Sequence, residues 1–518
     1  MSVSRQTRSI DELDPPLVPD PRRWAVLAVV CLAVFVTVLD GTIVNVALPS
    51  LAVELEASTR QLQWIVDAYL LVFTGLLLAA GGIGDKFGRK RMLLIGLLVF
   101  GATSAFTGSV GSAGALISGR ALMGIGAAMI FPATLAILTN TFSDPAERAK
   151  AIGAWSAVSG MAVAAGPIAG GWLLEHFWWG SVFFVNVPVT LLVAVGAWRL
   201  IPESREADAP RLDLPGVGWS IAAIASLVFT IIEAPEWGWL SPATLGGFVG
   251  SAVLLTIFVR WELHTTTPML PVTIFTNLRF SAASVAVTSA FFALFGFIFL
   301  ITQYFQLVRG YGPLEAGLRT LPVAVSIAIA SVAAPQIVQR IGTTNVVRAG
   351  LLSMAIGFAW IAWRASVDMS YAEIVGQMVF LGVGLGSTTA PATESIMGSL
   401  AVEKAGIGSA VNDTTRELGG TLGVAIIGSV FSSVYIGALG NLGPGSVFTR
   451  LPPEAQTLTR ESVGAARIIA ADLGPNAAAY LAEVNEAFLS GLSIGCLVAA
   501  GVATAGALFV GRFLPARA

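Results

Sequence analysis

The chain has 518 residues, of which 55% are hydrophobic and only 12% are charged, and its mean hydropathy is +0.80. A soluble domain typically carries about 25% charged residues, so this composition excludes a soluble globular protein and indicates a membrane protein with many spans. The net charge of −2 excludes nothing by itself, because the charges are sorted by position along the chain.

Continuous apolar runs recur along the whole chain, and each is about long enough to cross a ~30 Å hydrocarbon core as an α-helix. Because the runs show no strand-like alternation, they exclude a transmembrane β-barrel and predict an all-α polytopic fold. The fourteen expected helices cover residues 24–48, 62–82, 92–110, 115–138, 150–174, 180–200, 214–233, 242–260, 279–308, 315–338, 346–366, 372–396, 405–436 and 487–512. An even number of helices places both termini on the same side of the membrane.

The cationic residues assign the two sides. Residues 81–91, GGIGDKFGRKR, hold four cations, one carboxylate and four glycines between two apolar runs, which is typical of a tight cytoplasmic loop. With this loop inside, the cytoplasmic segments carry twenty Lys and Arg and the external segments seven, which is the bias of the positive-inside rule. Both termini are then expected in the cytoplasm.

An internal repeat divides the chain. The spacing of the glycines and the aspartate in residues 81–88 returns 254 residues later as Pro335, Gln339 and Gly342. This indicates a duplicated six-helix unit, an architecture known in transporters, and the excess length fits two inserted helices. The expected segments are a cytoplasmic tail at 1–22, a six-helix bundle at 23–200, a linker with two extra helices at 201–278, a second six-helix bundle at 279–512 and a cytoplasmic tail at 513–518. Within the second bundle, residues 437–486 are amphipathic and mixed in charge, and fit either an ordered external lid or a loose loop.

Four stretches resemble the signature motifs of one family. They are LDGTIVNVALP at 39–49, GGIGDKFGRKRML at 81–93, RALMGIGAA at 120–128 and GPIAGG at 166–171. On these motifs and on the helix spacing, the chain is similar to the major facilitator superfamily, and within it to the fourteen-helix drug:proton antiporters of the EmrB/QacA type. Two positions depart from the pattern, because Met123 stands where Gln is usual and Ala162 replaces the first Gly of the antiporter motif.

The resemblance implies that the 81–91 loop is a conformational latch between the two bundles, whereas its residues alone also fit a plain topology anchor. The residues expected to form the latch are Gly81, Asp85, Gly88, Arg89, Lys90 and Arg91. Asp85 sits among the cations and is suited to pair with them or to cap a neighbouring helix.

The antiporter motif predicts a hinge in the fifth expected helix. Small residues let membrane helices approach closely, and a proline interrupts the helical hydrogen-bond ladder. The residues of the expected hinge are Gly166, Pro167, Gly170 and Gly171. Ordinary close packing is the alternative interpretation.

Charges inside apolar runs are the sharpest indications of function, because one charge at the bilayer centre costs about 2.5–3.5 kcal/mol even on lenient scales. Asp40, Asp67 and Arg120 fall at similar depth in the outer part of their helices. An Asp40–Arg120 or an Asp67–Arg120 pair is therefore expected, with protonation of the aspartate releasing the arginine and coupling proton entry to transport. The alternative is a static ion pair, and Asp67 also fits a position at the membrane interface.

The thirteenth expected helix carries Asp413, Arg416 and Glu417, which share one helix face at i, i+3 and i+4. At this depth the cluster is expected to face a cavity or another helix. Together with Glu394, near the end of its helix, it is predicted to recognise a cationic substrate. Proton carriage and a satisfied polar patch are the alternatives, and Glu394 and Glu233 also fit water-exposed helix ends.

A phenylalanine stripe follows helical spacing in the ninth expected helix. Its members are Phe291, Phe292, Phe295 and Phe299, with Gln303, Tyr304 and Gln306 after them. Packing or lipid contact explains such a stripe, and the alternative is the wall of a pocket in which cation–π contacts hold a lipophilic cation.

Taken together, the sequence predicts a proton-coupled antiporter that exports amphipathic, cationic drugs or toxic compounds by alternating access. A dedicated exporter of a self-made antibiotic, lipid or metabolite and a proton-coupled importer are the alternatives. An enzyme is disfavoured, because the two histidines fall in loops, the two cysteines lie far apart, and no P-loop pattern occurs. No cofactor, metal or nucleic acid is expected. The expected setting is the bacterial cytoplasmic membrane, with the lipid bilayer, protons and a small amphipathic substrate as partners and the chain as a monomer.

Overall fold

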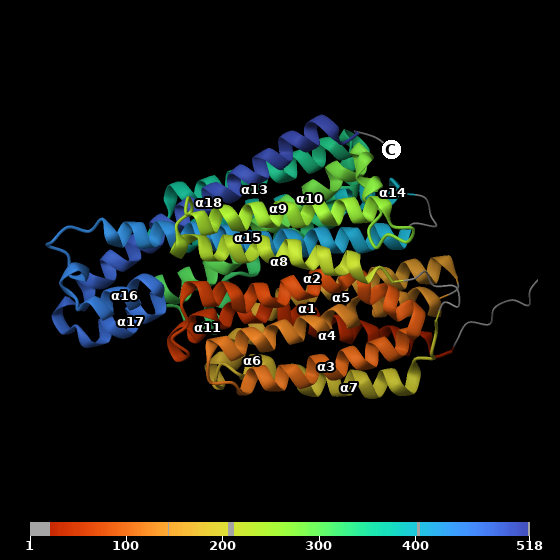
Figure 1. Cartoon of the computed structure of the whole chain (residues 1–518), viewed down its shortest axis with the longest axis horizontal. Coiled ribbons are helices and arrows are strands. Elements are labelled where there is room, and N and C mark those ends of the chain that lie inside the picture. Colours follow the sequence, from red (N-terminus) through yellow and green to blue (C-terminus); the bar gives the residue numbers. More distant parts are fainter. Residues whose placement is uncertain (1–20, 143, 206–211, 401–404, 516–518) are drawn as a thin grey trace, which may run out of the picture.

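The computed structural model describes residues 21–142, 144–205, 212–400 and 405–515, and in these ranges it is built from helices without strands. Figure 1 shows the helices lying roughly parallel along the long axis. Most of the predicted tail at 1–22, and residues 516–518 of the predicted tail at 513–518, lie outside the described residues. Within the described ranges, thirteen helices are long and apolar enough to cross a membrane. Helix α2 is bent by 52° between Thr59–Leu77 and Ala79–Phe87, and it raises the number to fourteen when it is counted as one span.

The first half forms one group of helices. They are α1 (Arg23–Glu54), α2 (Thr59–Phe87), α3 (Arg89–Ser109), α4 (Ala113–Thr141), α5 (Pro145–His176), α6 (Ser181–Phe184) and α7 (Asn186–Leu200). In it α1 packs on α5, α2 packs on α4, and α3 packs on both α4 and α7. The sixth expected span is broken at Val185, between α6 and α7.

The second half repeats this arrangement. Its helices are α10 (Leu278–Gln303) with a π-helical turn at Tyr304–Val308, α11 (Pro313–Arg319), α12 (Leu321–Ile341), α13 (Thr343–Arg364), α14 (Tyr371–Gly398), α15 (Ala405–Gly440) and α18 (Ala477–Phe513). Here α10 packs on α15, α12 packs on α14, and α13 packs on both α14 and α18. Each contact has its counterpart in the first half, as a duplicated unit requires.

Two glycines mark equivalent turns in the two halves. Gly88 separates α2 from α3 with φ +117°, and Gly342 separates α12 from α13 with φ +84°. Side chains with a Cβ rarely adopt this region of backbone space, whereas glycine enters it freely. Both turns therefore depend on a glycine with positive φ. The cations that directly follow Gly88 have no counterpart after Gly342.

Two extra helices lie along the junction of the halves (Figure 1). They are α8 (Leu214–Trp237) and α9 (Pro242–His264), which pack on each other. Helix α8 also contacts α2 of the first half and α15 of the second. Leu71, Ile231 and Ala425 meet there in a small apolar core of their own, so α8 is in contact with both halves at once.

Residues 441–476, called the cap here, form short helices beyond one end of the bundle (Figure 1). They comprise 3₁₀ turns at Phe448–Arg450 and Gly474–Asn476 and the helices α16 (Pro453–Glu461) and α17 (Val463–Asp472). Helix α17 packs on α1 and α18, and Tyr435 Oη donates to the carbonyl of Thr459 at 2.9 Å. We call this the cap end of the molecule, and the opposite end, which carries residues 81–91, the loop end.

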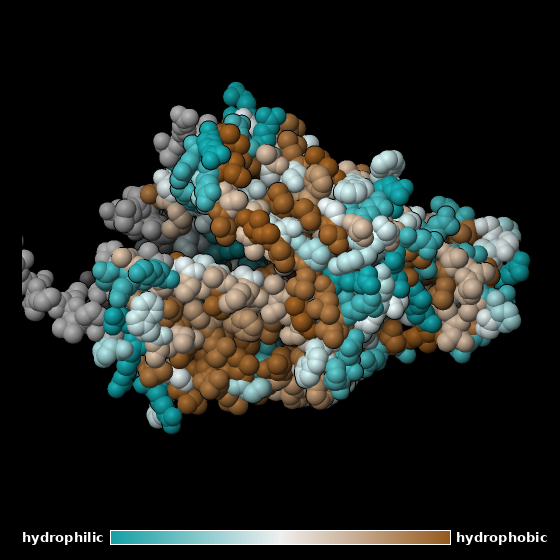
Figure 2. All heavy atoms as spheres, turned by 180° about the vertical axis from the view of Figure 1, so that it is seen from behind, coloured by the Kyte–Doolittle hydropathy of each residue, from teal (hydrophilic) through white to brown (hydrophobic). Residues whose placement is uncertain are grey.

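Helix α18 begins at Ala477, ten residues before the expected start at 487. Its first turns pack through Tyr480 and Val484 on the cap side, and their polar residues lower the hydropathy that defined the apolar run. Figure 2 shows the wider surface pattern, a broad apolar belt with hydrophilic side chains gathered toward both ends.

Candidate functional site

A buried ion pair joins α1 and α4. Arg120 Nη1 donates to Asp40 Oδ2 at 2.5 Å, and both side chains are fully shielded from solvent. Asn186 of α7 donates to the other oxygen, Asp40 Oδ1, at 2.8 Å. The carboxylate is thus held by a guanidinium and an amide from two further helices, which is how a charge is tolerated inside a membrane protein.

The arginine is fixed from other directions as well. Arg120 Nε donates to the carbonyl of Ile65 on α2 at 3.0 Å. The guanidinium carbon lies 4.2 Å from the centre of the Tyr69 ring, a cation–π contact. Tyr69 in turn donates its hydroxyl to the carbonyl of Thr37 on α1 at 3.2 Å. Arg120 therefore connects α1, α2 and α4 through a carboxylate, a carbonyl and an aromatic face.

Asp67 is buried on α2 without a partner. Its side chain is fully shielded, and among the described residues neither carboxylate oxygen has a hydrogen-bond partner. Of the two pairings expected for Arg120, the structure forms the one with Asp40. On α2 the arginine instead contacts the carbonyl of Ile65 and the ring of Tyr69, two residues on either side of Asp67. An ionised carboxylate in this position lacks every form of compensation, so Asp67 is suited to hold a proton.

The three charged residues of α15 lie together. Arg416 Nη1 is 3.8 Å from Asp413 Oδ1, and its guanidinium lies 4.8 Å from the centre of the Phe291 ring. Asn412 donates to Asp413 Oδ1 at 3.4 Å. Glu417 forms no ion pair within the described part of the chain.

The remaining expected acids lie elsewhere. Glu394 is exposed on α14 and does not join the α15 cluster. Glu233, near the cap end of α8, accepts from Arg60 of α2 at 2.8 Å, and Glu236 pairs with the same arginine. Glu394 is thus exposed, as a water-exposed helix end would be, whereas Glu233 is buried and paired with Arg60.

The phenylalanine stripe of α10 serves mainly for packing. Phe292 and Phe299 are buried, and the half-buried Phe295 lies against Gly420 of α15. Phe291 is the member that contacts a charge, the guanidinium of Arg416. One ring of the stripe thus meets the polar cluster.

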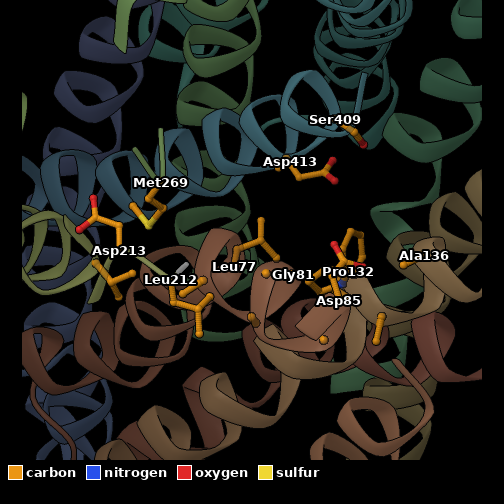
Figure 3. A pocket seen from close by; sticks show the side chains of 18 of the residues that line it. Leu77, Gly81, Asp85, Pro132, Ala136, Leu212, Asp213, Met269, Ser409 and Asp413 are labelled. Atoms are coloured by element: carbon orange, nitrogen blue, oxygen red, sulfur yellow. The ribbon is translucent and has the colours of Figure 1, made fainter. Parts of the chain in front are cut away.

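A cavity of about 820 Å³ opens between the halves at the loop end. Figure 2 shows the surface hollowed there. Three parts of the chain line it: the loop-end half of α2 with α4, the start of α8 with residues 266–271, and the start of α15. In Figure 3, Asp413 extends into the cavity from one wall, opposite Asp85, Gly81 and Pro132 on the other. The cavity is large enough for a drug-sized molecule.

Residues 81–91, predicted as a loop, are helical on both sides of Gly88, because α2 extends to Phe87 and α3 begins at Arg89. This turn borders the cavity and is tied to the first half. Asp85 pairs with Arg89 at 2.7 Å. Lys90 Nζ donates to the carbonyl of Trp198 at 2.7 Å, and Arg91 lies 3.6 Å from Glu203. These partners belong to the loop itself or to the end of α7 and the segment after it. Gly81 lies against Pro132 of α4, and a Cβ on Gly88 would lie 2.6 Å from Glu203 Oε1.

The antiporter motif of α5 lies where the halves meet near the cap end. Gly166 and Gly170 face α1 through Thr42 and Ile43. A Cβ on Gly171 would lie 2.6 Å from the backbone of Leu314 on α11, and a Cβ on Gly317 would lie 2.2 Å from the carbonyl oxygen of Pro167. The glycines therefore permit backbone-to-backbone contact between the halves.

Two glutamines add hydrogen bonds across this junction, and of these the sequence had indicated only Gln306, as a polar residue that follows the phenylalanine stripe. Gln63 Nε2 of α2 donates to the carbonyl of Ala425 on α15 at 3.1 Å. Gln306 Nε2 donates to the carbonyl of Val46 on α1 at 2.9 Å. Their only sequence signal is an amide within an apolar run. With the glycine contacts they close the junction near the cap end, while the cavity keeps the loop end open.

The family model for the Major Facilitator Superfamily matches residues 30–424. The chain belongs to the Major Facilitator Superfamily. Two curated members of similar length resemble it over most of both chains. The multidrug efflux pump LfrA of Mycolicibacterium smegmatis is 36% identical over 95% of this chain and 96% of its own. The methyl viologen resistance protein SmvA of Salmonella typhimurium is 35% identical over 90% of this chain and 93% of its own.

Solved structures show the same fold. A bacterial homolog of the human lysosomal transporter Spinster, in an inward-facing and unoccupied conformation, superposes with a TM-score of 0.69 at 18% identity, over 96% of this chain and 98% of that one. This superfamily moves small molecules across membranes, so the chain is a multi-pass transporter. In the part of the chain that the structure describes, no group of three or more His, Cys, Asp or Glu residues is placed to hold a metal ion.

Proposed function

We propose that the chain is a proton-coupled antiporter that exports amphipathic, cationic compounds by alternating access. The observation that carries the proposal is the shielded Asp40–Arg120 pair, with the unpartnered Asp67 on the neighbouring helix. The names of two relatives, a multidrug efflux pump and a methyl viologen resistance protein, support drug export. We place the chain in a bacterial cytoplasmic membrane as a monomer.

The loop end is the cytoplasmic end in this proposal. The excess of Lys and Arg on the loop side supports this orientation, and it puts both termini in the cytoplasm and the cap outside. The cavity then opens to the cytoplasm, where an exporter collects its substrate, and the junction at Gly171 and Gly317 separates it from the exterior.

Proton coupling works through the partner of Arg120. A proton on Asp40 removes the charge that Arg120 faces at 2.5 Å. The buried guanidinium is then left without a counter-ion, which is strongly unfavourable. If Asp67 loses its proton at the same time, it becomes the new counter-charge on α2. Exchange of protons between these two carboxyl groups thus moves Arg120 between α1 and α2, and the helices shift with it.

Substrate recognition falls to the second half. Asp413 lines the cavity, and the carboxylate of Glu417 has no ion-pair partner in the described chain. Both attract a cation, and the Phe291 ring, which now holds Arg416, offers an aromatic face to a flat ligand. A cation that displaces Arg416 from Asp413 and Phe291 gains a charge contact and an aromatic contact together.

Transport by the purified protein in liposomes tests the proposal, with methyl viologen as the probe. The vesicles hold the protein with its loop end outward, and their interior is the acidic side. We expect this proton gradient to drive uptake of methyl viologen. An ionophore that collapses the gradient is expected to stop the uptake. Transport that proceeds unchanged after the collapse would refute proton coupling. Transport only in the opposite orientation would indicate an importer.

A dedicated exporter is the second candidate, and a relative's name favours it. The puromycin resistance protein pur8 of Streptomyces alboniger is 35% identical over 82% of this chain and 85% of its own. Competition in the same liposome assay separates the two candidates. A multidrug exporter lets many unrelated cations compete with methyl viologen, whereas a dedicated one responds to a single chemical class.

A further inference from the structure

Two carboxyl groups meet where α8 begins and α9 ends, away from the Asp40 site. Asp213 and Glu262 are 8% and 3% exposed. Asp213 Oδ1 accepts from the backbone N–H of Gly216 at 3.0 Å and from Trp261 Nε1 at 2.8 Å. Glu262 Oε2 accepts from the backbone N–H of Leu270 at 3.0 Å. Each carboxyl group thus has one oxygen that accepts hydrogen bonds from the surrounding chain.

The two remaining oxygens border the same buried space beside Gly216. Asp213 Oδ2 and Glu262 Oε1 are buried and have no hydrogen-bond partner in the part of the chain that the structure describes. Both approach one point above Gly216, where a Cβ would lie 2.4 Å from the first and 2.6 Å from the second. Two buried carboxyl groups that share one site disfavour ionisation of both at once, because the like charges repel each other. One proton shared between the two oxygens gives each of them a hydrogen-bond partner.

No cation of the described chain takes the place of that proton. On α9, His264 is exposed and bonds the carbonyl of Arg260, whose side chain is also exposed. The segment after α9 presents backbone N–H groups to Glu262 and no charged side chain. From α2, α3, α4 and α15, the other helices at this cavity, the charged residues in its lining are the paired Asp85 and Arg89, and Asp413.

We infer that Asp213 and Glu262 bind a single proton between them, and that this proton fastens the segment at 266–271 to the base of α8. The fastening matters because the segment forms part of the cavity wall (Figure 3, near Met269). With the proton bound, Glu262 holds Leu270 while it bonds Asp213. When the proton leaves, two like charges face each other and the segment separates from α8. The width of the cavity mouth then depends on cytoplasmic pH independently of Asp40.

Labelling of a cysteine in this segment tests the inference. Thr267→Cys is placed in the cavity wall of a chain in which Cys31 and Cys496, both buried, are changed to alanine. A membrane-impermeant maleimide is added from the loop side across a range of pH. Asp213→Asn provides the reference at each pH, since asparagine also caps a helix and its amide N–H replaces the shared proton. The ratio of the two labelling rates cancels the titration of the thiol itself.

We divide the labelling rate of the chain with Asp213 intact by that of Asp213→Asn. We expect this ratio to rise several-fold toward alkaline pH, and Glu262→Gln to remove the rise. The control is Glu236→Gln, which changes a carboxylate at the other end of α8 and is expected to leave the pH profile as it was. A ratio that is flat with pH, or a rise that survives in Glu262→Gln, overturns the inference. A profile set by sodium concentration in place of pH also overturns it, since the occupant is then a metal cation.

Infrared difference spectra give a second readout that needs no added cysteine. A protonated carboxyl group absorbs at a C=O frequency distinct from that of a carboxylate. We expect one such band to disappear as pH rises and to be missing in both Asp213→Asn and Glu262→Gln. A band that persists unchanged in both variants contradicts the shared proton. Neither experiment measures transport, so failure of the proposed antiport leaves these outcomes readable.

Discussion

Arg120 of α4 holds the carboxylate of Asp40 of α1 at 2.5 Å, and neither side chain has any surface in contact with solvent. Around the pair, Asn186 supplies a second donor and Tyr69 an aromatic face. Such an arrangement is stable only while the charges remain matched, because an uncompensated buried charge costs several kcal/mol. Whatever changes the charge of Asp40 therefore changes the packing of three helices.

Asp40→Asn keeps the size of the side chain and removes its charge. Arg120 then stays buried without a counter-ion, and loss of one partner of a buried pair costs about 3–5 kcal/mol. We expect a lower melting temperature and loss of proton-driven efflux, with substrate binding retained. Thermal unfolding and liposome transport measure these effects. Glu54→Gln, at the exposed end of the same helix, is the matched control. Wild-type pH dependence of efflux in Asp40→Asn would remove this residue from the coupling step.

The α15 acids are expected to discriminate substrates by charge. Asp413→Asn with Glu417→Gln removes two carboxylates and leaves Arg416 in place. A hydrogen bond to a charged group contributes about 1.5–3 kcal/mol, and about 1.4 kcal/mol corresponds to a factor of ten in affinity. We therefore expect the KM for methyl viologen to rise roughly tenfold or more, while a neutral amphipathic substrate is little affected. Equal losses for both substrates would argue for a structural role.

Gly317→Ala is expected to open the junction near the cap end. The added Cβ would lie 2.2 Å from the carbonyl oxygen of Pro167, and overpacking of this kind costs about 1–3 kcal/mol. The conformer with this junction closed thus loses population. Spin labels at His176→Cys and Leu318→Cys, both exposed near the junction, report the change as a longer distance. Gly160→Ala on α5, where a Cβ meets nothing within 4 Å, provides the comparison that leaves the distance unchanged.

Asp85→Asn separates a latch from a topology anchor. The Asp85–Arg89 pair is an i, i+4 ion pair at a partly exposed site, which contributes only about 0.3–0.5 kcal/mol to stability. We expect normal expression and strongly reduced transport, since the proposed role of Asp85 lies in exchange between conformers. Lys86→Gln changes an exposed neighbour in the same turn and is expected to transport normally. A well-expressed Asp85→Asn protein with normal efflux would leave the loop as an anchor alone.

Much of the fold was accessible from hydropathy, because a membrane span is defined by a local property of about 20 residues. The difference at α18 shows the limit of that approach. The helix extends past the apolar run to Ala477, since Tyr480 and Val484 pack on the cap side. Tertiary contacts beyond the apolar belt thus stabilise helical structure in residues that are too polar to be predicted as part of a span.

The buried charges were also visible in the sequence, but their pairing was not. Asp40 and Asp67 lie at similar depth on neighbouring helices, and only the rotation of each helix decides which carboxylate faces Arg120. The proximity of Asp213 and Glu262 was not predictable from the sequence for a different reason. Both lie at helix ends where carboxylates are usually wet, and their burial arises from the packing of α8 on α9 and the segment after it.

Helix α8 is fastened to both halves near the cap end. Glu233 and Glu236 pair with Arg60 of α2, and Trp239, just beyond the helix, donates to Ser433 of α15 at 2.9 Å. If the halves separate at that end to release a molecule, α8 cannot keep both attachments. Charge-assisted bonds are roughly twice as strong as neutral ones, so the bond to Ser433 is expected to break first and α8 to travel with α2. The inserted helices then act as a tether that limits the amplitude of outward opening, a restraint that a carrier built from the two bundles alone would lack.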